Sequence, residues 1–186
     1  MEIQAFINQN EDYLPLLKKM GVKVRSFKDL LILSLPYHKQ PDQNLLIQMR
    51  GIVVDKKNHK IVCVPPKKSI LVNVEDLEIG DMEDIEYEEL IDGTMINLFY
   101  HNEWLISTRT EIGGYNKWSD KKSFKQMFDE TCDFDLDDLS KEYSYSFVLR
   151  HRDNRNVSPI IKDELYLVEM YHISEEIKRV ERKDFP

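Results

Sequence analysis

The stretch DIEYEELIDGTMINLFYHNEWLISTR, residues 84–109, decides the fold class. Its apolar and polar residues alternate in segments that are separated by Asp92-Gly93 and by His101-Asn102. Because successive side chains of a β-strand point to opposite faces, this alternation is typical of half-buried strands. Asp-Gly between two such segments is among the stronger short-range signals for a β-hairpin. The stretch therefore predicts antiparallel strands that are joined by tight turns at these two places.

The segments on either side extend the same pattern. Five further segments are rich in branched apolar or aromatic residues, and we expect strands in each of them: LLILSL before Pro36, LLIQMRGIVVD (Leu45–Asp55), HKIVCV (His59–Val64), YSYSFVLR (Tyr143–Arg150) and ELYLVEMYHI (Glu164–Ile173). The turn-like sequence KKN at 56–58 joins the second of these segments to the third. Gly51–Val64 is therefore predicted to form a hairpin.

Two segments have the features of helices. Asn10–Met20 can form a short helix that ends at Gly21, a residue typical of helix C-termini. Residues 119–131, SDKKSFKQMFDET, begin with a Ser/Asp cap, and their apolar residues recur at helical spacing: Phe124, Met127 and Phe128. We expect an α+β protein of mainly antiparallel sheets with two or three helices, forming a single domain over residues 1–186.

Composition restricts the class of protein. The 186 residues are 41% hydrophobic and 32% charged, an ordinary balance for a globular chain. The sequence contains no apolar run long enough to cross a bilayer, and its start lacks the basic and then apolar plan of a secretory signal. Cys63 and Cys132 are isolated, and the histidines are scattered without metal-ligand spacing. We therefore expect a cytoplasmic protein with reduced thiols, no metal site and no membrane partner.

The charge distribution argues against a general nucleic-acid coat. The formal net charge is -8, whereas binding to phosphate backbones depends on basic residues. Acidic residues also cluster at 75–89 and at 129–138. Such runs are usually solvated loops or faces, and we take this as the default over metal binding.

Several of these segments, in this order, resemble the adenylyltransferase domain of phage- and virus-type RNA ligases. The matching elements are Arg50–Asp55 (RGIVVD), Lys60–Lys68 (KIVCVPPKK), Leu90–Thr94 (LIDGT, at the place of the signature Lys-x-Asp-Gly-Ser/Thr), Ser107–Arg109 (STR), Ser146–Val157 (SFVLRHRDNRNV) and the strand LYLVEMYHI. Each element alone is weak, so their order and spacing between Leu30 and Ile173 carry the resemblance. It implies a nucleotidyltransferase fold of the ATP-grasp-like RNA ligase type.

The resemblance also implies a truncation after the strand 165–173. The family's two later motifs, a Glu-Gly strand and a Lys-x-Lys strand that supplies phosphate-binding cations, would lie beyond Pro186. The end of the chain, VERKDFP, contains Arg182-Lys183 but not the Lys-x-Lys pattern. Half of the family's phosphate-binding group is therefore expected to be missing.

The chemistry of the family is expected to be missing as well. Its signature lysine attacks the α-phosphate of ATP and holds AMP covalently, which requires an amine with an available lone pair. Leu90 occupies that position, and no lysine stands between Lys68 and Lys117. Arg150 stands about where the family has an acidic residue near the nucleotide and metal, which reverses the local charge. The resemblance thus implies a pseudoenzyme without a catalytic residue, for which ATP and Mg matter only if binding is retained.

Vestigial nucleotide-binding positions are implied at Arg50, Asp92, Gly93, Arg109 and Phe147. Each has an alternative interpretation. Asp92-Gly93 can be a hairpin turn, which we favour. Arg50 and Arg109 can pair with the acidic segment 75–89, and Phe147 can be a core residue.

The most basic part of the chain is a second candidate site. It consists of Arg150, His151, Arg152 and Arg155. This basic patch can bind nucleic acid, dock on an acidic protein surface or balance nearby acids. Lys67 and Lys68 can hold a phosphate or lie in a solvated loop.

Three functions follow as hypotheses. The first is a catalytically inactive, RNA-ligase-like structural or interaction subunit, in a virion or another viral complex, because the family occurs in phages and large DNA viruses. The second is a pseudo-ligase that still binds ATP or RNA ends without chemistry. The third is an active RNA ligase or nucleotidyltransferase with an unorthodox nucleophile. Under the first hypothesis we expect association with a protein partner or with a second copy of the chain.

Overall fold

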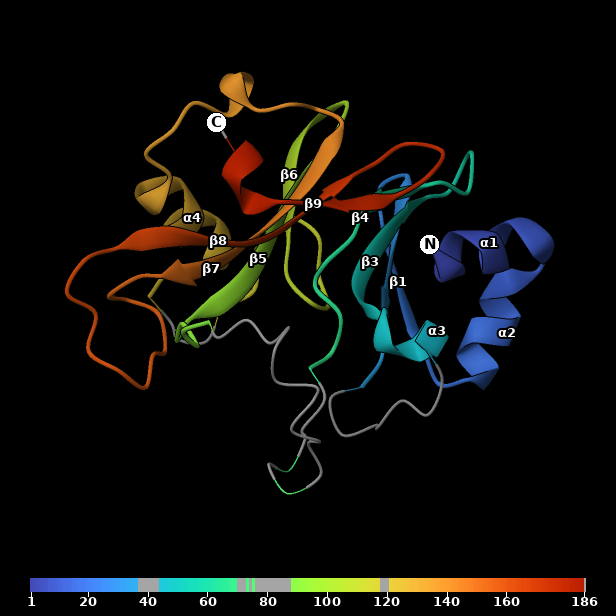
Figure 1. Cartoon of the computed structure of the whole chain (residues 1–186), viewed down its shortest axis with the longest axis horizontal. Helices are drawn as coiled ribbons and strands as arrows, with labels where there is room; N and C mark the ends of the chain where they lie inside the picture. Colours follow the sequence, from blue (N-terminus) through green and yellow to red (C-terminus); the bar gives the residue numbers. More distant parts are fainter. Residues whose placement is uncertain (37–43, 70–72, 74, 76–87, 118–120, 186) are drawn as a thin grey trace.

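The computed structural model describes residues 1–36, 44–69, 73, 75, 88–117 and 121–185. Two antiparallel sheets face each other in this part of the chain, and α-helices cover their outer faces (Figure 1). The predicted α+β class is confirmed. The described residues form four α-helices, one more than the upper expectation. Two of them, α1 (Glu2–Gln9) and α3 (Asn44–Ile47), were not anticipated from the sequence.

The first sheet contains four strands in the spatial order β1-β2-β3-β4. Their bounds are β1 (Lys23–Phe27), β2 (Leu30–Ser34), β3 (Arg50–Asp55) and β4 (Ile61–Cys63). Strand β2 is buried along its whole length, which explains its continuous apolar run. The predicted hairpin between Gly51 and Val64 is confirmed, since β3 pairs with β4 in antiparallel register.

The prediction of a strand that begins at Leu45 is wrong. Asn44–Ile47 forms the short helix α3, and the strand begins only at Arg50. In the turn after α3, the amide of Met49 donates to the carbonyl oxygen of Leu46. A short apolar run suits a buried helical turn as well as a buried strand, so its pattern alone could not separate the two.

The second sheet contains five strands in the order β6-β5-β7-β8-β9. Their bounds are β5 (Thr94–His101), β6 (Glu103–Ser107), β7 (Tyr143–Arg150), β8 (Glu164–His172) and β9 (Lys178–Val180). The turn between β5 and β6 is confirmed at His101-Asn102. Asn102 has a φ of 62°, a left-handed conformation that asparagine tolerates better than most residues.

The hairpin predicted at Asp92-Gly93 is wrong for the residues that the structure describes. Residues 88–92 are outside regular secondary structure, β5 begins at Thr94, and its partners are β6 and β7. The remainder of the expected preceding strand, 84–87, lies outside the described residues. Gly93 instead passes close to β7, where an added Cβ would lie 2.6 Å from the carbonyl oxygen of Leu149. The glycine is required here by a close approach of two backbones.

Three clusters of buried side chains hold the layers together. The first packs α1, α2 (Tyr13–Lys19) and α3 on the outer face of the first sheet, through residues such as Ile3, Leu17, Leu33 and Ile52. The second packs α4 (Phe124–Thr131) on the outer face of the second sheet. The third lies between the sheets and includes Ile32, Val53, Cys63 and Phe99. Alternate residues of β2 and β3 thus serve different cores.

The two helices predicted from the sequence are present. Helix α2 ends as expected, since Gly21 has a φ of 87° and the amides of Gly21 and Val22 donate to the carbonyl oxygens of Lys18 and Leu17. The cap of α4 is Ser123, whose hydroxyl accepts the amide of Gln126. The start predicted for this helix at 119–120 lies outside the described residues. None of the described helices has the length and apolar character needed to span a bilayer.

Candidate functional site

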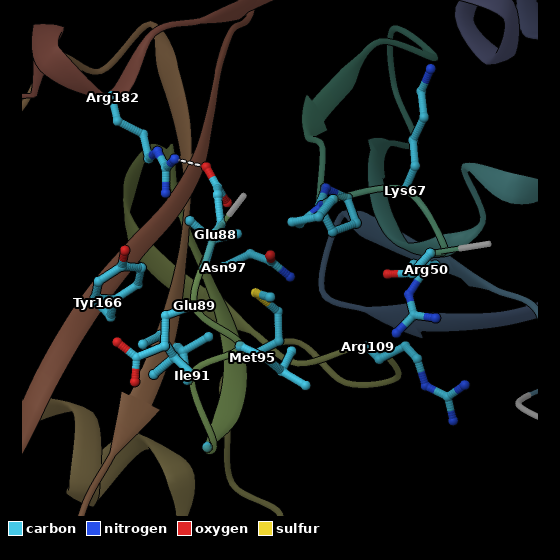
Figure 2. Close-up of a pocket in the computed structure, with 17 residues that line it drawn as sticks. Arg50, Lys67, Glu88, Glu89, Ile91, Met95, Asn97, Arg109, Tyr166 and Arg182 are labelled. Atoms are coloured by element: carbon cyan, nitrogen blue, oxygen red, sulfur yellow. Dashed lines mark hydrogen bonds and ion pairs between the residues drawn. The ribbon is translucent and has the colours of Figure 1, made fainter. Parts of the chain in front are cut away.

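A cleft of about 440 Å³ opens where the two sheets meet (Figure 2). Its apolar base consists of Met95 from β5, Val148 from β7, and Tyr166 and Val168 from β8. The side chain of Asn97 adds one polar group to this base. The opposite wall comes from the first sheet, through Arg50 at the start of β3 and the segment 65–67 that follows β4. The wall that carries Arg50 therefore faces the apolar residues of the second sheet.

Arg50 and Arg109 line the same cleft. They come together because Gly51 packs against the backbone of the segment that follows β6. A Cβ at Gly51, which has a φ of +111°, would lie 3.0 Å from the carbonyl oxygen of Arg109. Two positions that the ligase resemblance implies, and that are far apart in sequence, thus become neighbours.

Leu90, which the ligase resemblance aligns with the signature lysine, also lines the cleft. Its side chain is 96% exposed. The expectation that it closes a half-buried strand is wrong, because residues 88–92 lie outside the sheets. Leu90 has no atom that can attack a phosphate, so this part of the wall supplies apolar contact alone.

Of the described lysines, Lys67 is the one that lines this cleft. Figure 2 shows its side chain extending away from Met95 and Ile91. Lys67 also lines a neighbouring cavity beside Arg179. There its charge acts on Glu169: burial raises the pKa of that carboxyl, while Arg179 and Lys67 act in the opposite direction. The amine is therefore directed away from the Leu90 segment.

Asp92 supports a loop. Its Oδ2 accepts the backbone amides of Val157 and Ser158, both at 2.7 Å. These bonds join the segment before β5 to the loop between β7 and β8. Gly93 lines the cleft, whereas the carboxylate of Asp92 is engaged with this loop.

Phe147 is a core residue, 1% exposed, and its expected role in the nucleotide site is not supported by its position. Its ring stacks on Phe134 at a centroid distance of 5.9 Å, on the side of the sheet covered by α4. Its neighbour Val148 faces the cleft, because side chains alternate along β7. The aromatic residue of the cleft is Tyr166, which pairs with Val148 in the β7–β8 register. The sequence analysis did not identify Tyr166, because the strand register that places it beside Val148 is seen only in the structure.

The predicted basic patch is largely paired with acids. Three of its members contact carboxylates: Arg150 contacts Glu164 at 2.6 Å, His151 contacts Glu130 at 3.1 Å and Arg152 contacts Asp163 at 2.8 Å. The side chain of His151 is only 2% exposed. Arg155 is exposed. The geometry agrees with the interpretation in which these cations balance nearby acids.

Lys122 connects this region to α4. Its Nζ lies 2.6 Å from Glu130 and 3.0 Å from Asp153. The hydrogen bond from Lys122 holds the pKa of the Asp153 carboxyl below its ordinary value of 3.8, and a second bond from Lys121 acts in the same direction. Within the described ranges, the acidic, histidine and cysteine side chains form no group of three or more that could hold a metal ion.

Arg182 is a residue of the cleft that the sequence analysis did not identify. It belongs to the 3₁₀ helix η4 (Arg182–Asp184) and forms an ion pair with Glu88. Both residues line the cleft, and Glu89 adds a further carboxylate. No local pattern indicates this contact, because 94 positions separate its partners.

Comparison with known proteins yields little similarity. No family model matches the sequence. Over 50 residues, the chain is 36% identical to a protein of Invertebrate iridescent virus 3 that is described as an immediate-early protein ICP-46 homolog. This match spans 26% of the present chain and 11% of the viral protein. The chain therefore has a short similarity to a viral protein.

Proposed function

We propose that this protein is a catalytically inactive relative of the RNA ligases that binds a nucleotide or an RNA end reversibly in the cleft between its sheets. One observation carries the proposal. Arg50, Arg109 and Leu90 line the same cleft, and the resemblance to the ligases aligns Leu90 with the nucleophilic lysine. The chain thus keeps arginines that can bind a nucleotide and lacks the amine that would react with it.

The physical chemistry of the cleft supports this division. Guanidinium groups donate paired hydrogen bonds to phosphate oxygens, which makes arginine well suited to phosphate recognition. Met95, Val148 and Tyr166 offer the apolar and aromatic surface against which the nucleobase of a ligand can pack. Capture of AMP would require a nucleophilic amine next to the α-phosphate, and Leu90 cannot provide one.

A thermal-shift titration with ATP and magnesium tests the proposal. A ligand that binds only the folded state stabilises it by RT ln(1 + [L]/Kd), which is about 2.7 kcal/mol at 100 times Kd. We expect the melting temperature to rise with ATP concentration. Arg109→Gln and Arg50→Gln should each raise the Kd about tenfold or more, because bonds to charged groups contribute roughly 1.5–3 kcal/mol.

Arg152→Gln is the matched control, since Arg152 is exposed and pairs with Asp163 outside the cleft. It removes the same charge and should leave the Kd for ATP unchanged. A wild-type protein whose melting temperature does not move at millimolar ATP would refute the proposal.

A second candidate function is a structural or interaction subunit of a viral particle or complex. Three apolar side chains favour it, because they are almost fully exposed: Leu90 at 96%, Val157 at 94% and Ile161 at 96%. Val157 and Ile161 belong to the loop between β7 and β8, and Asp92, two residues after Leu90, accepts hydrogen bonds from the amides of Val157 and Ser158. Exposed apolar residues on such a loop are available for contact with a partner protein. The short similarity to a viral protein supports a viral setting.

Sedimentation of the purified protein separates this candidate from a free-standing domain. A subunit should associate with itself or with a co-purifying protein, and Val157→Ser with Ile161→Ser should weaken that association. A monomer that sediments alone at all concentrations would count against this candidate.

A further inference from the structure

The ion pair between Arg182 and Glu88 lies at the cleft, and both residues line it. It joins the 3₁₀ helix η4 to the segment that precedes Leu90. The side chains are 34% exposed for Arg182 and 47% exposed for Glu88. A ligand in the cleft can therefore reach this pair.

Arg182 and the two arginines already described lie on different sides of the cleft. Figure 2 shows Arg182 and Tyr166 on the same side of the cleft. Arg50 and Arg109 lie on the opposite side. The cleft consequently has guanidinium groups on both walls, with the apolar base between them.

An ion pair that is this exposed contributes little to stability, because water screens it and both side chains lose conformational freedom. A phosphate group offers the same guanidinium more oxygen acceptors and more negative charge than one carboxylate. A phosphate can therefore displace Glu88 from Arg182, which would break the contact between Glu88 and η4.

We propose that Arg182 is a further anion-binding residue of the cleft, in addition to Arg50 and Arg109, and that Glu88 pairs with it until a ligand binds. This inference rests on the function proposed above and narrows the class of ligand. Anionic groups that contact both walls require an extended polyanion, which favours a nucleoside triphosphate over a single phosphate. Glu88 then competes with the ligand and lowers its apparent affinity.

Calorimetric titration of the full chain with ATP and magnesium tests the competition. Glu88→Gln removes the competing charge and should lower the Kd about two- to fivefold, the range expected when an exposed ion pair is lost. Arg182→Gln should raise the Kd about tenfold. In the Arg182→Gln background, Glu88→Gln should have no further effect, because the two residues act through one contact.

Glu181 and Lys183 provide matched controls. They flank Arg182, form their own ion pair at 2.8 Å and are about three-quarters exposed. Neither lines the cleft. Glu181→Gln and Lys183→Gln should therefore leave the Kd at the wild-type value.

The outcomes separate this inference from the proposed function. If ATP binds but Glu88→Gln and Arg182→Gln behave like their controls, the competition is refuted and the nucleotide site remains. A higher Kd in Glu88→Gln than in wild type also refutes it. If ATP binds neither the wild type nor Glu88→Gln, both proposals fail.

Discussion

Gly93 passes so close to Leu149 that a Cβ on the glycine would lie 2.6 Å from the leucine carbonyl oxygen. Real Cβ atoms do not approach backbone oxygens this closely, so the start of β5 or the end of β7 would have to shift. We predict that Gly93→Ala lowers the free energy of unfolding by about 1–3 kcal/mol, the cost typical of overpacking. Urea denaturation measures this change, and an unaltered midpoint would show that the strands adjust freely.

Phe147 and Tyr166 are predicted to have opposite effects on stability and binding. Phe147→Leu should lower the free energy of unfolding by about 1–3 kcal/mol, because the ring is buried against Phe134. It should leave the Kd for ATP within about twofold of wild type. Tyr166→Ala should instead raise that Kd about two- to tenfold, since the ring lines the cleft.

Unfolding curves and ATP titrations of both variants measure these effects. The reverse pattern, with weaker binding in Phe147→Leu and normal binding in Tyr166→Ala, would place the nucleotide on the other face of the second sheet.

The contact between Asp153 and Lys122 predicts a pH dependence of stability. The folded-state pKa of Asp153 lies below the ordinary value of 3.8, so its contribution to stability is present above that value. The contribution is lost as the pH falls through the lowered pKa. Asp153→Asn should therefore lower the melting temperature at pH 7, and the difference from wild type should disappear in acid.

Asp138→Asn, at an exposed acid outside this contact, is the control and should follow the wild-type curve at every pH. A difference between Asp153→Asn and wild type that persisted unchanged below the lowered pKa would contradict the assigned cause.

Local patterns predicted the elements whose contacts are local. The β3–β4 and β5–β6 hairpins and the helices α2 and α4 follow from alternation, turn residues and caps within a few positions. Asp92-Gly93 misled the prediction because the glycine is required by the close approach of β7, which is distant in the sequence, and not by a hairpin turn. The run from Leu45 was ambiguous because a buried helical turn and a buried strand both require apolar residues.

The candidate site was predictable only in part. The resemblance to the ligases identified Arg50, Arg109 and Leu90, which all line one cleft. Phe147 was left open between the nucleotide site and the core, because residues 144–149 of β7 are apolar or small on both faces and their pattern could not show which face meets the cleft; the structure agrees with the core alternative. Arg182 was missed because its contact with Glu88 depends on how the end of the chain returns to the second sheet.

Mass spectrometry after incubation with ATP and magnesium tests the central claim most directly. Under native conditions, the protein should carry ATP non-covalently, and after denaturation it should return to its unmodified mass, since Leu90 offers no nucleophile. An AMP group that remains attached after denaturation would contradict the account, because some other amine, such as that of Lys67, would then capture the nucleotide.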